Sequence, residues 1–273
     1  MLSQRELQAP AVEELFDLAE RIGRGGRVAG WLEPTDDLTP EYRERIIFHL
    51  RKHGLMETGG GPAFFHMIPF VPHAQAAEHL CHIAAEELGH GRLNLEPLRD
   101  LGLDPDEIFQ SRWSMTAEQE RQQINLGARP SMGMTGFGDV LGFTMLFDPM
   151  GILVVGERVK SNYGPWSRAN AQVLREERGH AAFWERWGMD FIQSEEGHRQ
   201  VQRYIDAMFP QALGSLGRPG NDDPAYQVDK RLGIRTTDSD AYRSVLKEML
   251  TPTFQAVGFT LPECEPNYDS TLL

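Results

Sequence analysis

Cysteine, basic charge and long apolar runs are all scarce in this sequence of 273 residues. Its two cysteines, Cys81 and Cys264, form no CxxC or CxxxC pair, which excludes a disulfide scaffold and a cysteine-rich zinc site. Lysine and arginine total 27 against 40 acidic residues, a formal charge of −13, so broad binding to nucleic acid or anionic lipid is not expected. Apolar runs such as Ile152–Val155 are far shorter than the ~20 residues that cross a bilayer. The charges within Met1–Leu7 are unlike a secretory signal. We therefore expect a cytoplasmic protein with no nucleic-acid or membrane partner.

Strand patterns are also rare, whereas helical periodicity recurs along the chain. Thr39 and Pro40 have the residue types of a helix N-cap and first turn, and Gly59-Gly60-Gly61-Pro62 is typical of a helix break followed by a return through Ala63–Val71. Prolines 210 and 252 are expected to end later helices. The pattern predicts helices at 11–23, 39–59, 73–101, 115–125, 140–160, 167–195, 197–209 and 239–250. It indicates an all-α fold with one domain over 1–273, a core at about 40–210 and a C-terminal extension at 215–273.

A repeated pentapeptide carries the first chemical signal. Glu-Glu-x-Gly-His occurs at Glu86–His90 and again at Glu176–His180. In each copy the second glutamate and the histidine are three residues apart, on one face of a helix. Two helices with this Glu-x-x-His spacing are the source of paired carboxylate and imidazole ligands in di-iron bundles. The pattern selects Glu87, His90, Glu177 and His180 as metal ligands.

A di-iron site in a four-helix bundle needs one further carboxylate from each of the other two helices. Glu57 lies thirty residues before Glu87, and Asp148 lies twenty-nine before Glu177. The turn near Gly164 would bring Asp148 and Glu177 level within about one helical turn, at ~1.5 Å per residue. Glu57 and Asp148 complete the predicted set of six.

Blander interpretations remain open for each residue. One Glu-x-x-His pair alone is usually a solvated pair, and Glu157 is a weaker alternative to Asp148. Glu86 and Glu176 lie beside the ligand face, as supporting or surface groups. His53 shares a face with Glu57 and is either a donor to it or a satisfied buried histidine. A zinc site at His79, His82 and Glu86 lacks the His-Glu-x-x-His spacing, and no partner pattern marks His49, His66, His73 and His198.

Carboxylate-rich sites with one imidazole per metal favour a hard, redox-active ion such as iron over zinc. Oxygen chemistry at such a pair needs a dry pocket. Five apolar side chains near the ligands are candidates to line it, although plain core packing is the favoured interpretation for each: Met56, Phe143, Met145, Phe147 and Phe183.

From about Tyr42 to Pro262 the chain resembles the catalytic subunits of the phenylacetate catabolic di-iron family. The resemblance rests on His53-Gly-Leu-Met-Glu57, on Glu87-Leu-Gly-His90-Gly91, and on Asp148 fifteen residues before Tyr163-Gly164-Pro165. It continues from Arg168 through the second pentapeptide and at the ending Thr251-Pro252 to Leu261-Pro262. The iron ligands of the family fall on Glu57, Glu87, His90, Asp148, Glu177 and His180.

The resemblance implies a ferritin-like bundle that inserts oxygen from O₂ into an aromatic ring held as a CoA thioester, as in phenylacetyl-CoA. It implies two iron ions, a reductase carrying electrons from NAD(P)H, and a ferritin-like sister subunit or homo-oligomer. In this hypothesis Glu87 and Glu177 bridge or ligate, each histidine takes one iron, and Glu57 and Asp148 are terminal. No protein nucleophile is needed. Three alternatives remain: an oxygenase of secondary metabolism acting on an amine or carrier-bound acyl group, a non-catalytic subunit, and an iron-storage protein.

Overall fold

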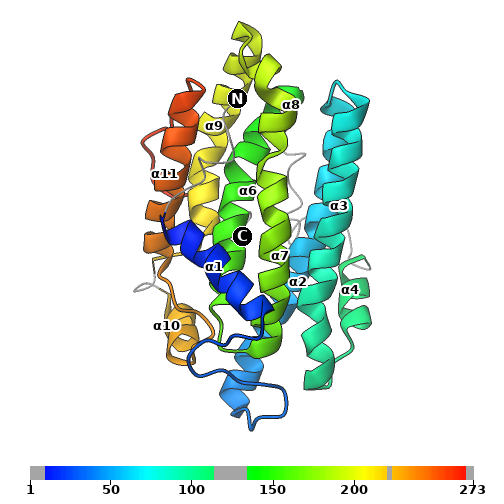
Figure 1. Ribbon diagram of the computed structural model, residues 1–273, viewed down its shortest axis with the longest axis vertical. Coiled ribbons are helices and arrows are strands. Elements are labelled where there is room, and N and C mark those ends of the chain that lie inside the picture. The colour runs from blue at the N-terminus through cyan, green and yellow to red at the C-terminus, as the bar shows by residue number, and fades with distance from the viewer. Residues whose placement is uncertain (1–9, 114–133, 220–222, 269–273) are drawn as a thin grey trace.

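The computed structural model describes residues 10–113, 134–219 and 223–268, and nearly all of its regular structure is helical (Figure 1). Within these ranges, extended pairing is limited to an isolated parallel bridge between Leu32 and Tyr163. The all-α prediction is confirmed, while the helix expected at 115–125 lies outside the described residues. The helices are α1 (Pro10–Gly23), α2 (Pro40–Met67), α3 (Ala74–Leu95), α4 (Pro105–Trp113), α6 (Phe137–Val159), α7 (Gly164–Ala181), α8 (Phe183–Ile192), α9 (Glu195–Ser215), α10 (Pro224–Arg231) and α11 (Ser239–Ala256), with 3₁₀ turns η1 (Ile68–Phe70) and η2 (Glu96–Leu101).

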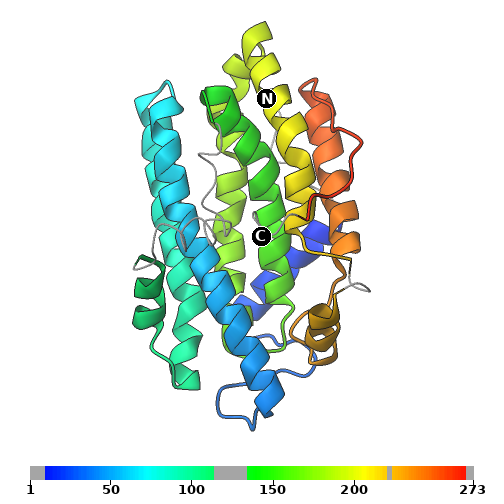
Figure 2. The ribbon, with the colours of Figure 1, turned by 180° about the vertical axis from the view of Figure 1, so that it is seen from behind.

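Four long helices position the predicted ligands. Helix α2 packs along α3, α6 packs along α7, and α3 contacts α7, so the two pairs form one bundle. Helices α9 and α11 lie on the side of α6 away from α2 and α3, and α1 crosses α6 and α7 obliquely (Figures 1 and 2). The amphipathic pattern explains α1, because Val12, Leu15, Ala19 and Ile22 are its buried residues.

The start of α2 agrees with its sequence, but its end does not. Thr39 accepts a hydrogen bond from Tyr42 N and Pro40 follows as the first helical residue. The helix then continues through Gly59–Pro62 to Met67, so the predicted break and return through Ala63–Val71 were wrong. The reason is packing: a Cβ on Gly61 would lie 3.0 Å from the Ala84 carbonyl oxygen. Here glycine serves close approach to α3 and does not end the helix.

Other helix ends also differ from the prediction. The helix expected at 167–195 ends at Ala181, and Ser194 caps α9 through Gly197 N at 3.0 Å. Pro210 and Pro252 lie inside α9 and α11, which they were expected to end. A proline inside a helix costs about 3 kcal/mol. Buried residues on both sides of each proline, such as Ile205 and Leu213 around Pro210, offset this cost.

Helix α6 is longer and more apolar than the sequence analysis expected of any segment. By length and composition alone, Phe137–Val159 could cross a membrane. However, 78% of its most apolar window is buried inside the bundle. Three buried acids also interrupt it, Asp139, Asp148 and Glu157. These features favour a central helix of the protein core.

Candidate metal centre

Four predicted ligands lie within reach of one metal ion. Glu57 on α2, Glu87 and His90 on α3, and Glu177 on α7 each offer one atom, and these atoms all lie within 4.8 Å of one another. Each residue is no more than 9% exposed. Carboxylate oxygens combined with an imidazole nitrogen suit divalent transition metals such as iron.

Each histidine of the repeated pentapeptide contacts the first glutamate of the other copy. His90 Nε2 lies 2.9 Å from Glu176 Oε2, and His180 Nε2 lies 3.0 Å from Glu86 Oε2. Because a carboxylate accepts, each Nε2 carries a proton, and Nδ1 is the nitrogen that can bind a metal once its own proton is displaced. The contacts favour a supporting role for Glu86 and Glu176, since a carboxylate on the outer nitrogen orients a metal-binding imidazole.

The two Nδ1 atoms point into the cluster. His90 Nδ1 lies 3.3 Å from Glu177 Oε1. His180 Nδ1 lies 3.2 Å from Glu87 Oε1 and 3.6 Å from Glu177 Oε2. Both Nδ1 atoms are buried without a hydrogen-bond partner in the described part of the chain. His180 therefore lies next to the group of four ligands, in contact with its members Glu87 and Glu177.

Asp148, the sixth predicted ligand, comes from α6 and is also buried. Its Oδ2 has no hydrogen-bond partner among the described residues. Burial raises the pKa of Asp148 well above its ordinary value, and the charges of Glu177 and Glu87 add to the rise while His180 opposes it. The structure thus places Asp148 in the electrostatic neighbourhood of the cluster, and its ligation of metal stays a prediction.

The charged side chains of the cluster shift one another's pKa values strongly. Burial, with the charges of Glu177 and Glu57, raises the pKa of Glu87 to about 7. Burial would lower the pKa of His90, but contact with Glu177 outweighs it and raises that pKa to about 9. Burial would raise the pKa of Glu177, but its contacts with His180 and His90 hold that pKa far below the usual range. Four buried acids crowd two imidazoles, an arrangement that a pair of divalent cations would neutralise.

The residues fit a di-iron group on several observations of the structure. Both Nδ1 atoms and Asp148 Oδ2 are buried without a hydrogen-bond partner in the described part of the chain. A cradle also exists on α2, because a Cβ on Gly60 would lie 2.2 Å from Glu87 Oε2. The ligand arrangement, two Glu-x-x-His helices plus one acid from each of two others, is that of di-iron carboxylate bundles.

The alternatives weighed from sequence are engaged elsewhere. Glu157 accepts hydrogen bonds from Thr237 N at 3.0 Å and Tyr242 Oη at 2.7 Å, in a polar cluster of its own. In the alternative zinc site, His79 Nδ1 accepts from Trp187 Nε1 at 2.9 Å, and Glu86 is bonded to His180 at 3.0 Å.

His53 proves to be the neighbour of a predicted ligand. Its Nε2 lies 2.6 Å from Glu57 Oε1, and both side chains are buried. Burial alone would raise the pKa of Glu57, but His53 outweighs it and the net shift is downward. Of the remaining histidines, His49 has a partner that the sequence did not reveal, Asp229 Oδ2 at 2.7 Å. The 180 residues between His49 and Asp229 explain why local spacing could not find it.

Phenylalanines form a dry side of the cluster. Phe143 stacks on Phe147 with 5.0 Å between ring centroids, and Phe64 meets Phe143 edge-on with 5.9 Å between centroids. Phe64 also lies edge-on to His180 at 6.2 Å. Phe64 was missed from sequence because the expected break at Gly59–Pro62 removed it from the helix. Phe183 and Met145 belong to the buried core, as does Phe64, while Phe143 and Phe147 are partly buried against it.

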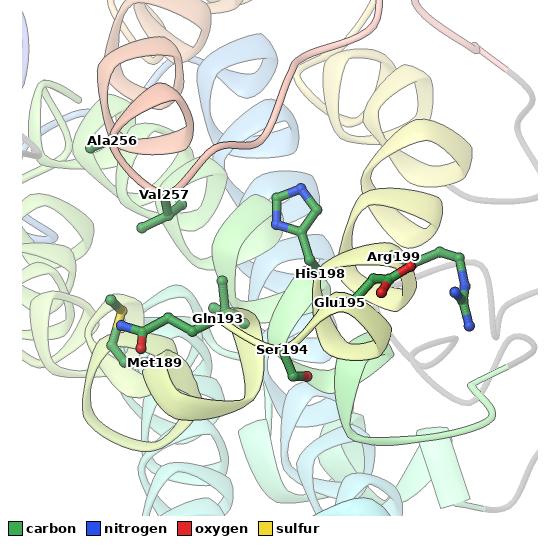
Figure 3. Close-up of a pocket in the computed structure, with 9 residues that line it drawn as sticks. Met189, Gln193, Ser194, Glu195, His198, Arg199, Ala256 and Val257 are labelled. Carbon is green, nitrogen blue, oxygen red and sulfur yellow. The ribbon is translucent and has the colours of Figure 1, made fainter.

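A separate surface pocket of about 660 Å³ lies between the α8–α9 turn and the end of α11 (Figure 3). None of its lining residues is a predicted ligand, so it is distinct from the metal centre. The lining residues are Met189, Ile192, Gln193, Ser194, Glu195, His198, Arg199, Ala256 and Val257.

Comparison with known proteins identifies the family of this chain. The chain is 22% identical over 240 residues to one of the subunits of the 1,2-phenylacetyl-CoA epoxidase of Escherichia coli (strain K12), an alignment that covers 88% of this chain and 75% of the relative. Residues 12–271 match the family described as phenylacetic acid catabolic protein. Because that match spans nearly the whole sequence and includes all six predicted ligands, the protein belongs to the phenylacetic acid catabolic protein family.

Proposed function

We propose that this protein is the catalytic subunit of a di-iron monooxygenase that acts on an aromatic acyl-CoA. The observation that carries the proposal is the pair of reciprocal contacts, His90 with Glu176 and His180 with Glu86, which aim two unpartnered Nδ1 atoms at buried carboxylates. Membership of the family and the activity named for the relative support an oxidoreductase that uses O₂. The proposal goes beyond this support in two respects: the substrate is an aromatic CoA ester, and the chain is the catalytic subunit.

The six predicted ligands would hold the metal: Glu57, Glu87, His90, Asp148, Glu177 and His180. Two iron ions bound there would supply the activation of O₂, with one oxygen atom going to the substrate and the other leaving as water at the expense of two electrons and two protons. Glu86 and Glu176 keep the imidazoles in the orientation and tautomer needed for binding. With a pKa of about 7, Glu87 is partly protonated at neutral pH, and a bound cation would displace that proton.

The phenylalanine side would exclude water from the substrate. Phe64 connects His180 to the Phe143–Phe147 stack, so an aromatic ring placed there would meet apolar surface next to the cluster. A dry site protects a reactive oxidant from reduction by solvent. This surrounding favours insertion of oxygen into an apolar ring over oxidation of a charged amine.

The test is anaerobic loading with Fe²⁺, then addition of O₂, an NADPH-linked reductase and phenylacetyl-CoA, with products analysed by mass spectrometry. About two iron ions per chain and a CoA ester heavier by one oxygen atom support the proposal. Oxygenation of amines but not of CoA esters would favour the oxygenase of secondary metabolism. A chain that binds no iron would contradict the proposal, and a hollow shell filled with mineral would indicate storage.

A further inference from the structure

A row of rings connects the surface of α2 with a predicted ligand. His49 lies 5.3 Å from Phe48 between ring centroids, and 5.7 Å from Trp166 of α7. The next ring, His53, is 5.9 Å from Trp166, and its Nε2 lies 2.6 Å from Glu57 Oε1. Each step is a direct ring contact, so the row reaches the cluster without a gap.

The inner part of the row is buried and fixed. Trp166 is 1% exposed, and its Nε1 donates to Asn94 Oδ1 at 2.9 Å. Asn94 in turn donates to the backbone oxygen of His90, also at 2.9 Å. His49 is held by Asp229, which also binds Arg45 through two hydrogen bonds of 2.7 and 2.8 Å. The rings are thus held by hydrogen bonds as well as by packing.

The outer end of the row is exposed, and three of its four charged neighbours within one turn of α2 are basic. Phe48 is 48% exposed, unlike most large apolar side chains of this protein. Arg45 lies over its ring at 5.0 Å and is paired with Asp229. The exposed Arg51 and Lys52 follow one helical turn along α2, and the exposed Glu44 lies one turn before Phe48. In a chain with a formal charge of −13, this is a local excess of basic residues beside an exposed aromatic side chain. Such a surface suits an acidic protein that must dock transiently.

We propose that the row Phe48–His49–Trp166–His53 carries electrons to the metal centre from an acidic iron–sulfur protein that docks around Phe48. The proposal rests on the proposed function, because it needs iron at the cluster. In each event the donor is oxidised by one electron and one Fe³⁺ becomes Fe²⁺. Two events supply the electrons that one O₂ requires.

Trp166 acts in this route as a bridge and not as a stable radical. The Arg158 guanidinium lies 5.9 Å from the Trp166 ring, and a positive charge there disfavours loss of an electron from the indole. On α2, His53 precedes Glu57 and Phe64 follows it. Phe64 connects to the Phe143–Phe147 stack, which the proposed function reserves for substrate. Separate sides for donor and substrate would let both be bound at once.

Two exposed phenylalanines on α2 give a matched test. Phe48 is 48% and Phe65 47% exposed, but Phe48 alone belongs to the row. The iron-loaded, oxidised protein is mixed anaerobically with reduced plant-type ferredoxin, and loss of the ferric absorbance is followed by stopped flow. We expect Phe48→Ala to lower the second-order rate constant about tenfold and Phe65→Ala to change it less than about twofold. The parent rate should fall as salt rises.

A second pair tests the interior of the row. Trp166→Phe shortens the central ring, while Trp187→Phe removes a half-buried indole that also makes one hydrogen bond, to His79 at 2.9 Å. At saturating ferredoxin we expect the first-order rate constant to fall about tenfold for Trp166→Phe only. Reduced methyl viologen, a small carrier that needs no docking surface, should reduce all variants at the parent rate.

These measurements separate the route from the function on which it rests. Iron content and the viologen rate of the parent establish a reducible metal centre before any ferredoxin is added, and their failure contradicts the proposed function itself. With that centre established, equal ferredoxin rates for Phe48→Ala and Phe65→Ala overturn the docking surface. Equal rates for Trp166→Phe and Trp187→Phe overturn the route, as does a parent that ferredoxin cannot reduce.

Discussion

The two acids predicted as terminal ligands, Glu57 and Asp148, lie in opposite surroundings. Glu57 contacts His53 at 2.6 Å, and His53 is the inner end of the row of rings that reaches the surface at Phe48. Asp148 has a buried Oδ2 without a partner among the described residues and follows Phe147 of the phenylalanine stack. The pKa of Glu57 is lowered because His53 outweighs burial, whereas burial raises the pKa of Asp148.

The difference shows that equal charge and nearly equal spacing do not give equal chemistry. The lowered pKa favours an ionised Glu57 before metal binds, while the raised pKa favours a proton on Asp148 that a metal would have to displace. We expect the Glu57 half to hold metal and receive electrons, and the Asp148 half to face substrate. The predictions below test this division, beginning with the residues that both halves share.

Glu177 contacts both histidines and serves both halves, so its loss should have the largest effect. We expect Glu177→Gln to lower iron binding from about two ions per chain to fewer than about one. Iron per chain after anaerobic loading and desalting is the measurement. Glu157→Gln is the control, since this buried acid is bonded to Thr237 and Tyr242 away from the cluster. Full iron binding by Glu177→Gln would show that the halves do not share this ligand.

Asp229 stabilises the outer end of the Glu57 half, where it binds His49 and Arg45. Burial raises its pKa, but hydrogen bonds from His49 and Arg45 outweigh burial and the net shift is downward. This contribution to stability is present above the ordinary pKa of 3.8 and is lost as the pH falls through the lower folded value. We expect Asp229→Asn to reduce the free energy of unfolding by about 3 kcal/mol at pH 7.

The check is urea unfolding of parent and Asp229→Asn at pH 7 and at pH 3. Burial lowers the pKa of His49, so the imidazole is neutral at pH 7 and bonds Asp229 as an N–H donor. The stability difference should narrow at the lower pH, where Asp229 of the parent begins to be protonated. A difference that is constant or widens toward acid pH would contradict the assigned charge.

Neutralising each terminal acid in the metal-free protein tests the comparison directly. Glu57→Gln removes a charge that His53 contacts, and we expect the free energy of unfolding to fall by about 2 kcal/mol at pH 7. Asp148 has a raised pKa, so the proton that the folded state retains costs stability as the pH rises above 3.8. Asp148→Asn should therefore stabilise the metal-free protein by about 1 kcal/mol.

Urea unfolding after exhaustive chelation measures both changes, and iron loading provides the internal check. Both variants should bind iron less well than the parent, because both acids are predicted ligands. Equal destabilisation by Glu57→Gln and Asp148→Asn would remove the distinction between the two halves.

Local sequence was a good guide wherever one helix decided the outcome. The Thr39–Pro40 start, the buried face of α1 and the Glu-x-x-His faces of α3 and α7 all depend on residues within a few turns of one another. The sequence also selected the four residues that now lie together. It could not reveal the Glu176–His90 and Glu86–His180 contacts, because each joins residues about ninety positions apart.

Helix ends were predicted poorly where packing competes with propensity. Gly59–Pro62 and Pro210 have the residue types of helix breaks, yet burial against α3 and α6 continues both helices. The same mechanism hid Phe64 and the row through Trp166, since both depend on contacts between helices. Asp148 shows the limit for the site: its spacing nominated it as a ligand, but only its buried surroundings show that its pKa is raised.

Gly151, beside the cluster on α6, gives the smallest expected effect, and Gly60 on α2 is its comparison in the other half. A Cβ on Gly151 of α6 would lie 3.4 Å from Glu177 Oε2, at the edge of ordinary contact, whereas on Gly60 of α2 it would lie 2.2 Å from Glu87 Oε2. Alanine favours a helix over glycine by about 1 kcal/mol. We expect Gly151→Ala to gain up to that amount with iron binding unchanged. Gly60→Ala should lose iron, because the added methyl displaces the Glu87 carboxylate. Thermal unfolding and iron content measure both, and iron loss in Gly151→Ala would show that the Asp148 half is packed as tightly as the Glu57 half.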